Sequence, residues 1–356
     1  MERELKFKNW MINYLESTQP FRFIGKSIRN IMSLSETGNQ SDEVYIEVSS
    51  ICNAKCIFCN YRFGYRAKKQ MDIEIFRKLA QECHLLGYKK LNLTSLGGEF
   101  FTHPDALSII KIAKDIGFKH IGTYTNGILI SKFKLNSLLL SGLDTLRISF
   151  PGFNRDEYKL IYGVDKYDDF LNSILMLLES NHKSKKKINL IFEPRSRSSL
   201  KEIYENEIFK NKIEPYLSEF VTIVKPIVRY DSWGGEIKQS ELPRGMKLEI
   251  NPIKSIYPLK KVNLCSRITG IGILVNGDVR LCNCRYDSKI ESSDELIIGN
   301  LNQFDSLQSL IVSNYEKTQK IKSDFINGKL PNLCKACTFY SPISRGEAFS
   351  INKIQD

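Results

Sequence analysis

The chain has 356 residues, of which 42% are hydrophobic and 26% charged, and a formal net charge of +12. These fractions are typical of a soluble protein, and no stretch of about 18 uncharged apolar residues predicts a transmembrane span. The basic residues are spread along the chain and no nucleic-acid-binding module is recognisable, so the charge does not indicate a nucleic-acid partner.

The cysteines and the N-terminus indicate a cellular compartment. The chain contains nine cysteines, and residues 1–10 lack the apolar core of a signal peptide. We therefore expect metal binding in a reducing environment rather than a disulfide framework. The expected location is the cytoplasm.

Residues 1–42 are predicted to form an N-terminal extension that contains an amphipathic helix within residues 2–32. Its apolar residues are spaced like one helical face, with lysines and arginines on the remainder: Leu5, Phe7, Trp10, Met11, Tyr14 and Leu15. Such a face packs on its own domain or lies on a membrane surface. Packing is the favoured interpretation, and membrane-surface contact stays open.

Strand and helix patterns alternate regularly from residue 43 onward. Strands are predicted at 43–49, 89–95, 119–124, 145–150, 187–192 and 219–224, and helices near 72–86, 104–116, 131–141, 167–181 and 199–217. This alternation predicts parallel β-α units with right-handed crossovers, and six such units suit a partial barrel spanning residues 43–240. Active sites of parallel barrels lie at the carboxyl ends of the strands.

Three cysteines, Cys52, Cys56 and Cys59, follow the first predicted strand. Three thiolates at this spacing can hold three corners of an iron–sulfur cluster and leave the fourth iron open for chemistry. A zinc site or a set of buried thiols is the alternative, but no fourth ligand lies close in the sequence.

This spacing, with Phe58 directly before the last cysteine, resembles that of the radical S-adenosylmethionine (SAM) superfamily. The resemblance implies a six-unit partial TIM barrel and a 4Fe–4S cluster whose open iron chelates the amino and carboxylate groups of SAM. It also implies that electron transfer from the cluster cleaves SAM to methionine and a 5′-deoxyadenosyl radical, which abstracts a substrate hydrogen. An electron donor of the flavodoxin or ferredoxin type is the expected partner.

Three further strand ends resemble SAM-contacting segments of that superfamily. Gly97, Gly98 and Glu99 resemble its GGEP motif, with Phe100 in place of the proline, and imply contacts to the SAM amino group. The other segments contain Thr125-Asn126 and Ser149. They are equally well explained as ordinary turns.

A second cysteine set follows residue 240. Between Cys265 and Cys282, an Asn-Gly pair separates two apolar runs and predicts a β-hairpin, and Cys334 and Cys337 form a distant CxxC pair. The layout resembles the opening of a SPASM domain. Because no cysteine follows Cys337, it is more similar to the shorter twitch variant with one auxiliary 4Fe–4S cluster. A zinc ribbon is the alternative.

The predicted fold is therefore α/β: a partial (β/α)6 TIM barrel, a small twitch-like domain at 241–345 and a tail at 346–356. Candidate catalytic residues are the acids Glu193, Asp231 and Glu236, any of which could act as a base. Cys284 is interpreted as an inert thiol, a cluster ligand or a hydrogen donor to a substrate radical.

The resemblance implies a radical SAM oxidoreductase or epimerase with two clusters, acting on a small molecule. The first hypothesis is oxidation or epimerisation of a sugar or polyol carbon. The alternatives are epimerisation or crosslinking of a peptide, and a non-enzymatic zinc-binding adaptor. The cysteine motif specifies the first chemical step and leaves the outcome open.

Overall fold

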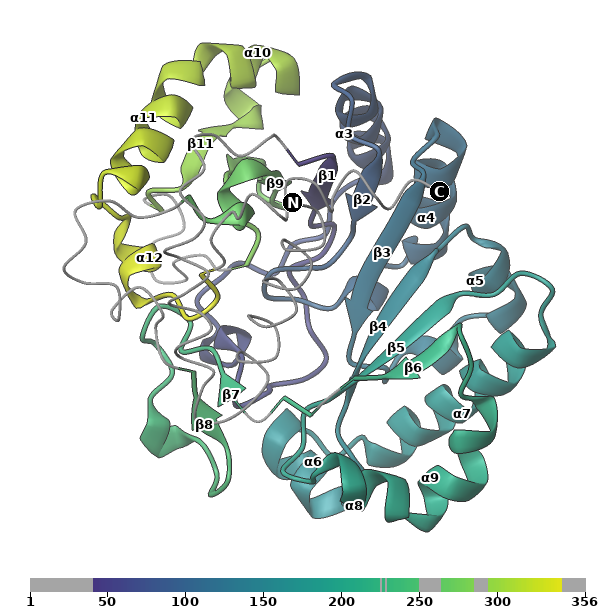
Figure 1. The fold of residues 1–356 in the computed structure, drawn as a ribbon. Coiled ribbons are helices and arrows are strands. Elements are labelled where there is room, and N and C mark those ends of the chain that lie inside the picture. The colour runs from purple at the N-terminus through teal and green to yellow at the C-terminus, as the bar shows by residue number, and fades with distance from the viewer. Residues whose placement is uncertain (1–40, 225, 228, 250–263, 285–293, 341–356) are drawn as a thin grey trace, which may run out of the picture.

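The computed structural model describes residues 41–224, 226–227, 229–249, 264–284 and 294–340 (Figure 1). Residues 1–40, with the expected N-terminal helix, and the tail at 346–356 lie outside these ranges. Within the described residues, the helices are either too short or too polar to cross a membrane.

A nine-stranded sheet in the order β11-β10-β9-β1-β2-β3-β4-β5-β6 organises the molecule. Its first six strands in chain order are β1 (Glu43–Ile46), β2 (Lys90–Asn92), β3 (His120–Thr125), β4 (Thr145–Phe150), β5 (Asn189–Pro194) and β6 (Val221–Ile223). Every neighbouring pair among these six is parallel. The predicted partial (β/α)6 barrel is confirmed, and all six predicted strands are present.

The two faces of this sheet differ in polarity. Val44, Ile46 and Leu146 are fully buried on the face toward the helices. The alternate positions point to the inner face, where Tyr45 pairs in register with Asn92 and Tyr124 pairs with Arg147. Because side chains alternate along a strand, the polar inner face is the surface available to a ligand.

Helices cover the outer side of the barrel strands (Figure 1). They are α3 (Ile73–Leu85), α4 (Ala106–Ile116), α5 (Leu135–Leu140), α6 (Arg155–Tyr162), α7 (Tyr167–Lys183), α8 (Leu200–Glu205) and α9 (Glu207–Lys212). Two 3₁₀ turns, η3 (Ile130–Lys132) and η4 (Glu214–Tyr216), lie between them.

Two predicted helices of the barrel are divided, and one barrel helix was not predicted; the three helices after residue 306 were not predicted either. The 199–217 segment breaks at Asn206, whose side chain accepts bonds from Ile208 N and Phe209 N and so starts α9. The 131–141 segment is a 3₁₀ turn followed by the short α5. Helix α6 was not predicted because it is short and half of its residues are charged, although Asn154 caps it through Glu157 N.

The C-terminal region extends the barrel sheet. The predicted hairpin is confirmed as β9 (Ile271–Ile273) and β10 (Asp278–Arg280), joined through Gly277 at a φ of 90°. Strand β9 pairs in parallel with β1, and β11 (Ile297–Asn300) pairs with β10. Helices α10 (Leu307–Ser313), α11 (Tyr315–Ile326) and α12 (Asn332–Ala336) follow, and β7 (Arg229–Tyr230) pairs separately with β8 (Lys247–Leu248).

Candidate active site

The three cysteines of the first motif lie together in the loop after β1. Burial first, and then the neighbouring Cys59 and Cys52 thiols, raise the pKa of Cys56 well above its usual value. Burial and Glu99 raise the pKa of Cys52 to about 12. The loop therefore collects three thiols in one partly enclosed place.

The last turn of α6 holds this loop. The backbone N–H groups of Lys55 and Ile57 donate to the carbonyl oxygens of Tyr162 and Ile161, both at 2.9 Å. Gly163 has a φ of 66°, and a Cβ atom there would lie 2.5 Å from the Lys55 carbonyl oxygen. Only glycine accommodates this close approach in the left-handed region.

The Gly97-Gly98-Glu99 turn lies against the same loop. Glu99 N donates to the Ile51 carbonyl at 2.7 Å, and a Cβ at Gly98 would lie 2.5 Å from the Ser49 carbonyl oxygen. The glycine thus permits the turn after β2 to contact the segment that leads to Cys52.

The Glu99 carboxylate connects this turn with the end of β3. It is buried and accepts bonds from Asn126 N at 2.8 Å and from Thr125 Oγ1 at 2.9 Å. Burial raises its pKa to about 7, although these hydrogen bonds act in the opposite direction. Sequence reasoning expected Glu99 to face the SAM amino group, whereas the structure has both its oxygens accepting bonds from the protein.

Asn126 and Ser149 extend the arrangement around the cysteine loop. Asn126 Nδ2 donates to Asn53 Oδ1 at 2.7 Å and lies 3.9 Å from Cys52 Sγ. Ser149 Oγ and Tyr162 Oη lie 2.9 Å apart. The predicted SAM-contacting segments therefore gather around one loop at the carboxyl ends of the strands.

Phe58 belongs to an aromatic cluster. Its ring stacks on Tyr230 at a centroid distance of 5.2 Å and meets the edge of Tyr162 at 5.8 Å. The Arg195 guanidinium lies 5.4 Å from the Phe58 ring centroid, and Trp233 Nε1 donates to the Phe58 carbonyl at 2.9 Å. Sequence reasoning missed these partners because each is distant in the chain.

The inner face carries a charged network that sequence reasoning found only in part. The Glu193 carboxylate accepts bonds from Arg147 at 2.7 Å, from Tyr124 Oη at 3.1 Å and from Arg195 at 3.3 Å. Burial and Glu193 raise the pKa of Tyr124 to about 12. The strand alternation at positions 124 and 147 was the signal that could have identified these residues.

Asp231 joins the segment after β7 to the second cysteine set. Its carboxylate accepts bonds from Trp233 N at 2.8 Å and from both the backbone and the hydroxyl of Thr338, the residue after Cys337. Trp233 has a φ of 49°, an uncommon value for a residue with a Cβ atom. Glu236 follows in the same turn, with its N–H directed to the Trp233 carbonyl at 3.4 Å.

The structure brings the second cysteine set together as well. Burial, followed by the Cys282, Cys337 and Cys265 thiols, raises the pKa of Cys334 well above its usual value. Beside them, the fully buried Arg280 pairs with Asp294 at 2.5 Å.

Cys284 lies beside Cys282, with its backbone N–H directed to the Cys282 Sγ at 3.4 Å. Its thiolate is the first cause of the raised pKa of Arg267, and it also contributes to the raised pKa of Tyr45 on β1. The structure thus places Cys284 beside residues of the barrel interior.

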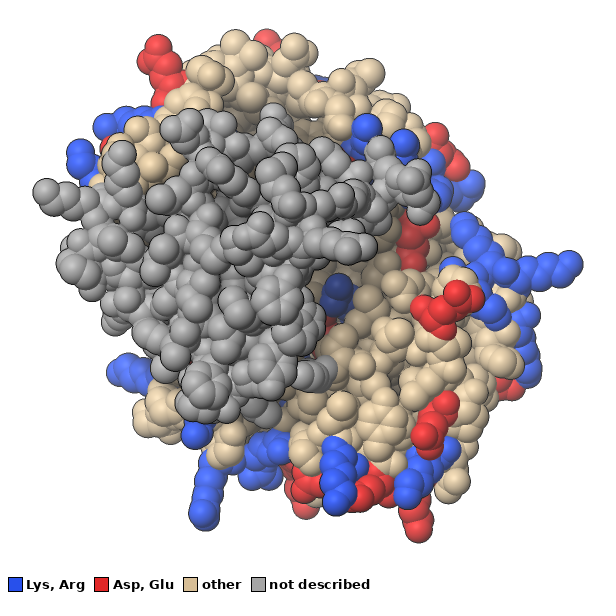
Figure 2. Space-filling model, in the orientation of Figure 1, with Lys and Arg blue, Asp and Glu red and all other residues tan. Residues whose placement is uncertain are grey.

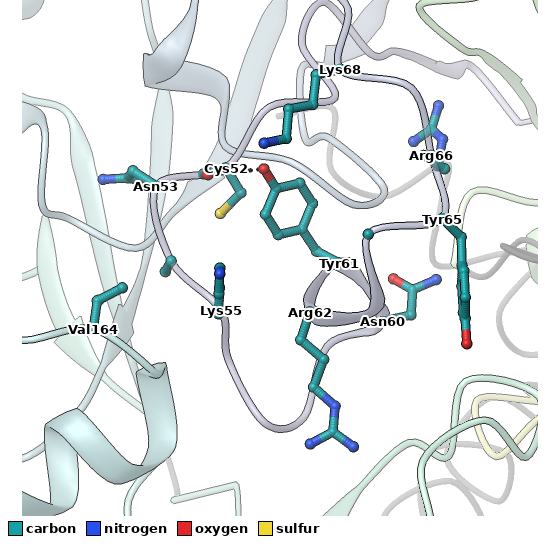
Figure 3. A pocket seen from close by; sticks show the side chains of 12 residues that line it. Cys52, Asn53, Lys55, Asn60, Tyr61, Arg62, Tyr65, Arg66, Lys68 and Val164 are labelled. Atoms are coloured by element: carbon teal, nitrogen blue, oxygen red, sulfur yellow. Dashed lines mark hydrogen bonds between the residues drawn. The ribbon is translucent and has the colours of Figure 1, made fainter.

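A pocket of about 290 Å³ lies against the cysteine loop, with Asn53 and Asn60 among its lining residues (Figure 3). Cys52 lines it together with four basic residues, Lys55, Arg62, Arg66 and Lys68. Tyr61 also faces it, and its hydroxyl donates to the Cys52 carbonyl at 3.0 Å (Figure 3).

The residues around the first cysteine set fit an iron–sulfur cluster. The three thiols are close enough to raise one another's pKa, and Asn53 Nδ2 and Asn60 Nδ2 are buried without an acceptor among the described residues. Cluster sulfur atoms accept hydrogen bonds from such donors. Across the described ranges, no three His, Cys, Asp or Glu side chains are grouped closely enough to hold a single metal ion. A four-iron cluster separates its ligating sulfurs more widely than one ion does.

Comparison with known proteins identifies a radical SAM domain and solved structures of similar fold. Residues 46–205 match the model of the radical SAM superfamily. The crystal structure of BtrN in complex with AdoMet and 2-DOIA is similar in fold, with a TM-score of 0.50, 15% identity and coverage of 85% of this chain and 94% of BtrN. Streptococcus suis SuiB bound to S-adenosylmethionine gives a TM-score of 0.51 and 17% identity over 80% of this chain and 68% of SuiB.

Curated relatives point to a different reaction from the predicted one. A probable GTP 3′,8-cyclase of Sulfurisphaera tokodaii is 25% identical over 276 residues, which cover 73% of this chain and 86% of the relative. A probable GTP 3′,8-cyclase of Saccharolobus solfataricus is 26% identical over 289 residues, covering 73% and 88%.

The functional predictions therefore need correction. Oxidation or epimerisation of a sugar or polyol, and modification of a peptide, are wrong because the relatives are named for the cyclisation of GTP. The zinc-binding adaptor is wrong because the first cysteine set lies within a radical SAM domain. The chain carries a radical SAM domain at residues 46–205, and it is an enzyme whose cofactors are SAM and a 4Fe–4S cluster.

Proposed function

We propose that this enzyme acts on GTP and joins C3′ of the ribose to C8 of the guanine base. The observation that carries the proposal is the similarity to probable GTP 3′,8-cyclases over 73% of this chain and 86% of the relative. That similarity extends well beyond the radical SAM domain at 46–205. The similarity therefore includes residues outside the radical SAM domain, and it is these residues that make the comparison informative about the substrate.

In this proposal, Cys52, Cys56 and Cys59 hold three irons of the cluster. Gly97, Gly98, Asn126 and Ser149 line the place for SAM, and Glu99 positions the Thr125-Asn126 turn through its two hydrogen bonds. When bound, the cluster and SAM together supply a 5′-deoxyadenosyl radical that removes a substrate hydrogen. Phe58 packs between Tyr230 and Tyr162 and so fixes the loop directly before Cys59.

The inner face of the barrel is the proposed place for the triphosphate. Arg147 and Arg195 converge on Glu193 there, and Arg267 lies close to Tyr45 on the same face. Arginine binds phosphate through paired N–H donors, so an incoming phosphate can take the place of Glu193 as the acceptor. Figure 2 shows a basic side chain within a recess of this surface, at the border of the undescribed residues.

The reaction balances as follows in atoms and electrons. The C3′–H bond breaks as hydrogen leaves to the 5′-deoxyadenosyl radical, and the C3′ radical adds to C8. The base is then left with one unpaired electron, so one electron and one proton must be added to give a closed-shell product. That product has the same elemental composition as GTP. The electrons come from a flavodoxin- or ferredoxin-type donor.

The second cysteine set completes the proposal. We infer that Cys265, Cys282, Cys334 and Cys337 hold an auxiliary 4Fe–4S cluster in a twitch-like region that begins near residue 241. Their mutual proximity supports this inference. The buried Arg280, which also donates to the Cys282 carbonyl, provides positive charge beside four thiolates.

An anaerobic assay with GTP, SAM and reductant tests the proposal. We expect 5′-deoxyadenosine, together with a GTP-derived product whose mass equals that of GTP but whose guanine absorbance is altered. ATP in place of GTP is the control for the base. A product-free reaction with GTP in a protein that still cleaves SAM would overturn the choice of substrate and leave the superfamily assignment intact.

A further inference from the structure

The pocket beside the cysteine loop has a basic rim to which the proposed reaction assigns no role. Cys52, a proposed cluster ligand, lines it together with Lys55, Arg62, Arg66 and Lys68 (Figure 3). A protein bound at the rim of this pocket would therefore lie close to one of the proposed cluster ligands. A short path of this kind is what electron entry into a buried cluster requires.

The four basic residues divide into two kinds. The Arg66 side chain is 5% exposed and pairs with Glu47 at 2.7 Å, and Arg62 pairs with Glu241 at 2.5 Å. These two arginines have partners within the fold and shape the pocket wall.

The lysines differ from the arginines. Lys55 and Lys68 are exposed, and within the described ranges their ammonium groups have neither an ion pair nor a hydrogen bond. Asp165, which follows the lining residue Val164 in the chain, is paired with Lys159 at 3.2 Å. The rim of the pocket thus presents two uncompensated positive charges.

An aromatic residue completes this surface. Tyr65 lines the pocket, is 50% exposed and stacks on Phe63 at a centroid distance of 5.6 Å. The Arg62 guanidinium lies 4.6 Å from the centroid of that Phe63 ring. Exposed tyrosine and arginine held in fixed orientations are enriched at protein–protein interfaces.

We propose that this surface, formed by Lys55, Arg62, Tyr65 and Lys68, is the docking site of an acidic electron-carrier protein. The carrier passes one electron to the cluster for each SAM cleaved and is itself oxidised by one electron. Its negative surface complements the two lysines and the net charge of +12. The inference rests on the proposed placement of the cluster at Cys52, Cys56 and Cys59.

Charge reversal at both lysines tests the docking site with reduced flavodoxin as the probe. For the Lys55→Glu/Lys68→Glu holoenzyme, we expect the KM for flavodoxin in SAM cleavage to rise at least about tenfold. The dissociation constant of the complex with oxidised flavodoxin should rise in parallel. Binding by the unaltered enzyme should also weaken as salt rises from about 50 to about 300 mM, and much less so in the variant.

Two controls isolate the docking step. With titanium(III) citrate, a small reductant, the double variant should cleave SAM at the unaltered rate and keep its full iron content. Lys119→Glu changes an exposed lysine at the opposite, amino end of the barrel strands and should leave the flavodoxin KM unchanged. Since SAM cleavage is measured without GTP, a wrong substrate assignment does not affect the result.

Three outcomes would overturn the proposal. One is an unchanged flavodoxin KM and affinity in the double variant, and another is an equal loss in Lys119→Glu. The third is a site for a small anion. It would be revealed if inorganic phosphate binds the unaltered enzyme but not the double variant, while flavodoxin binding is changed neither by phosphate nor by the double substitution. If the Lys55→Glu/Lys68→Glu variant loses iron, the Lys55→Met/Lys68→Met variant makes the same comparison with a smaller charge change.

Discussion

Arg147 on β4 donates to Glu193 on the neighbouring β5 at 2.7 Å, and the pair lies on the inner face of the barrel. Arg195 contacts the same carboxylate and also lies over Phe58, next to the cysteine loop. This pair therefore connects the proposed phosphate site with the proposed cluster site.

Replacing Arg147 with methionine should weaken GTP binding. A hydrogen bond to a charged group contributes about 1.5–3 kcal/mol, so we expect the KM for GTP to rise about 10- to 100-fold. SAM cleavage in the absence of GTP should be unchanged. Steady-state kinetics check both values. The matched control is Arg155→Met, because Arg155 lies on the outer helix α6 and pairs with Asp168 on α7. Equal effects of the two variants would contradict the account.

Gly163 should be required for the cysteine loop. Alanine there has both an unfavourable φ of 66° and a Cβ atom 2.5 Å from the Lys55 carbonyl oxygen. Gly64 has a similar φ of 70° with nothing within 4 Å, so Gly64→Ala measures the φ penalty alone. We expect Gly64→Ala to cost about 1 kcal/mol of unfolding free energy and Gly163→Ala about 1–3 kcal/mol more. Denaturant unfolding measures both, and equal losses would show that the close approach is unimportant.

Glu99 should make the stability of the cluster-free protein depend on pH. Burial raises its pKa from 4.5 to about 7, so between these values the folded state holds a proton that the unfolded state has lost. Stability from this group is therefore greatest at low pH and decreases as pH rises to 7, by about 3 kcal/mol. Unfolding at pH 5 and pH 8 should show this decrease, and Glu99→Gln should remove it. A pH dependence that persists in Glu99→Gln would assign it to other groups.

The two cysteine sets should be separable by substitution. Cys56→Ala removes a proposed ligand of the SAM-cleaving cluster and should abolish 5′-deoxyadenosine formation. Cys334→Ala should lose about half of the roughly eight irons expected for two clusters and retain part of the SAM cleavage. Iron analysis and product quantification after anaerobic reconstitution check both variants. Full iron content in Cys334→Ala would contradict the auxiliary cluster.

The barrel was predictable because local signals and global architecture agree in it. The apolar alternation at Val44 and Ile46 and at Leu146 and Ile148 marks strands, and Gly117 ends a helix at a φ of 113°. The division at Asn206 was harder to predict, because a single capping side chain interrupts a continuous helical pattern. The hairpin was predicted, but its parallel pairing with β1 depends on contacts between residues more than 200 positions apart.

The candidate site was predictable where a motif carries it and not where the fold assembles it. The spacing of Cys52, Cys56 and Cys59 is local, whereas the contact between Trp233 and the Phe58 carbonyl joins distant segments. Arg147 and Arg195 look like ordinary surface residues in the sequence. Only the structure shows that both pair with Glu193. The reaction could not be predicted, because the motif specifies how the radical is made and not which molecule receives it.

Transfer of deuterium from GTP labelled at C3′ tests the central claim most directly. The account predicts that the 5′-deoxyadenosine formed by the holoenzyme carries the deuterium and that the GTP-derived product is one mass unit lighter than the labelled substrate. Both changes should be absent in Cys56→Ala. Unlabelled 5′-deoxyadenosine from a reaction that consumes the labelled GTP would contradict hydrogen abstraction at C3′ and, with it, the proposed function.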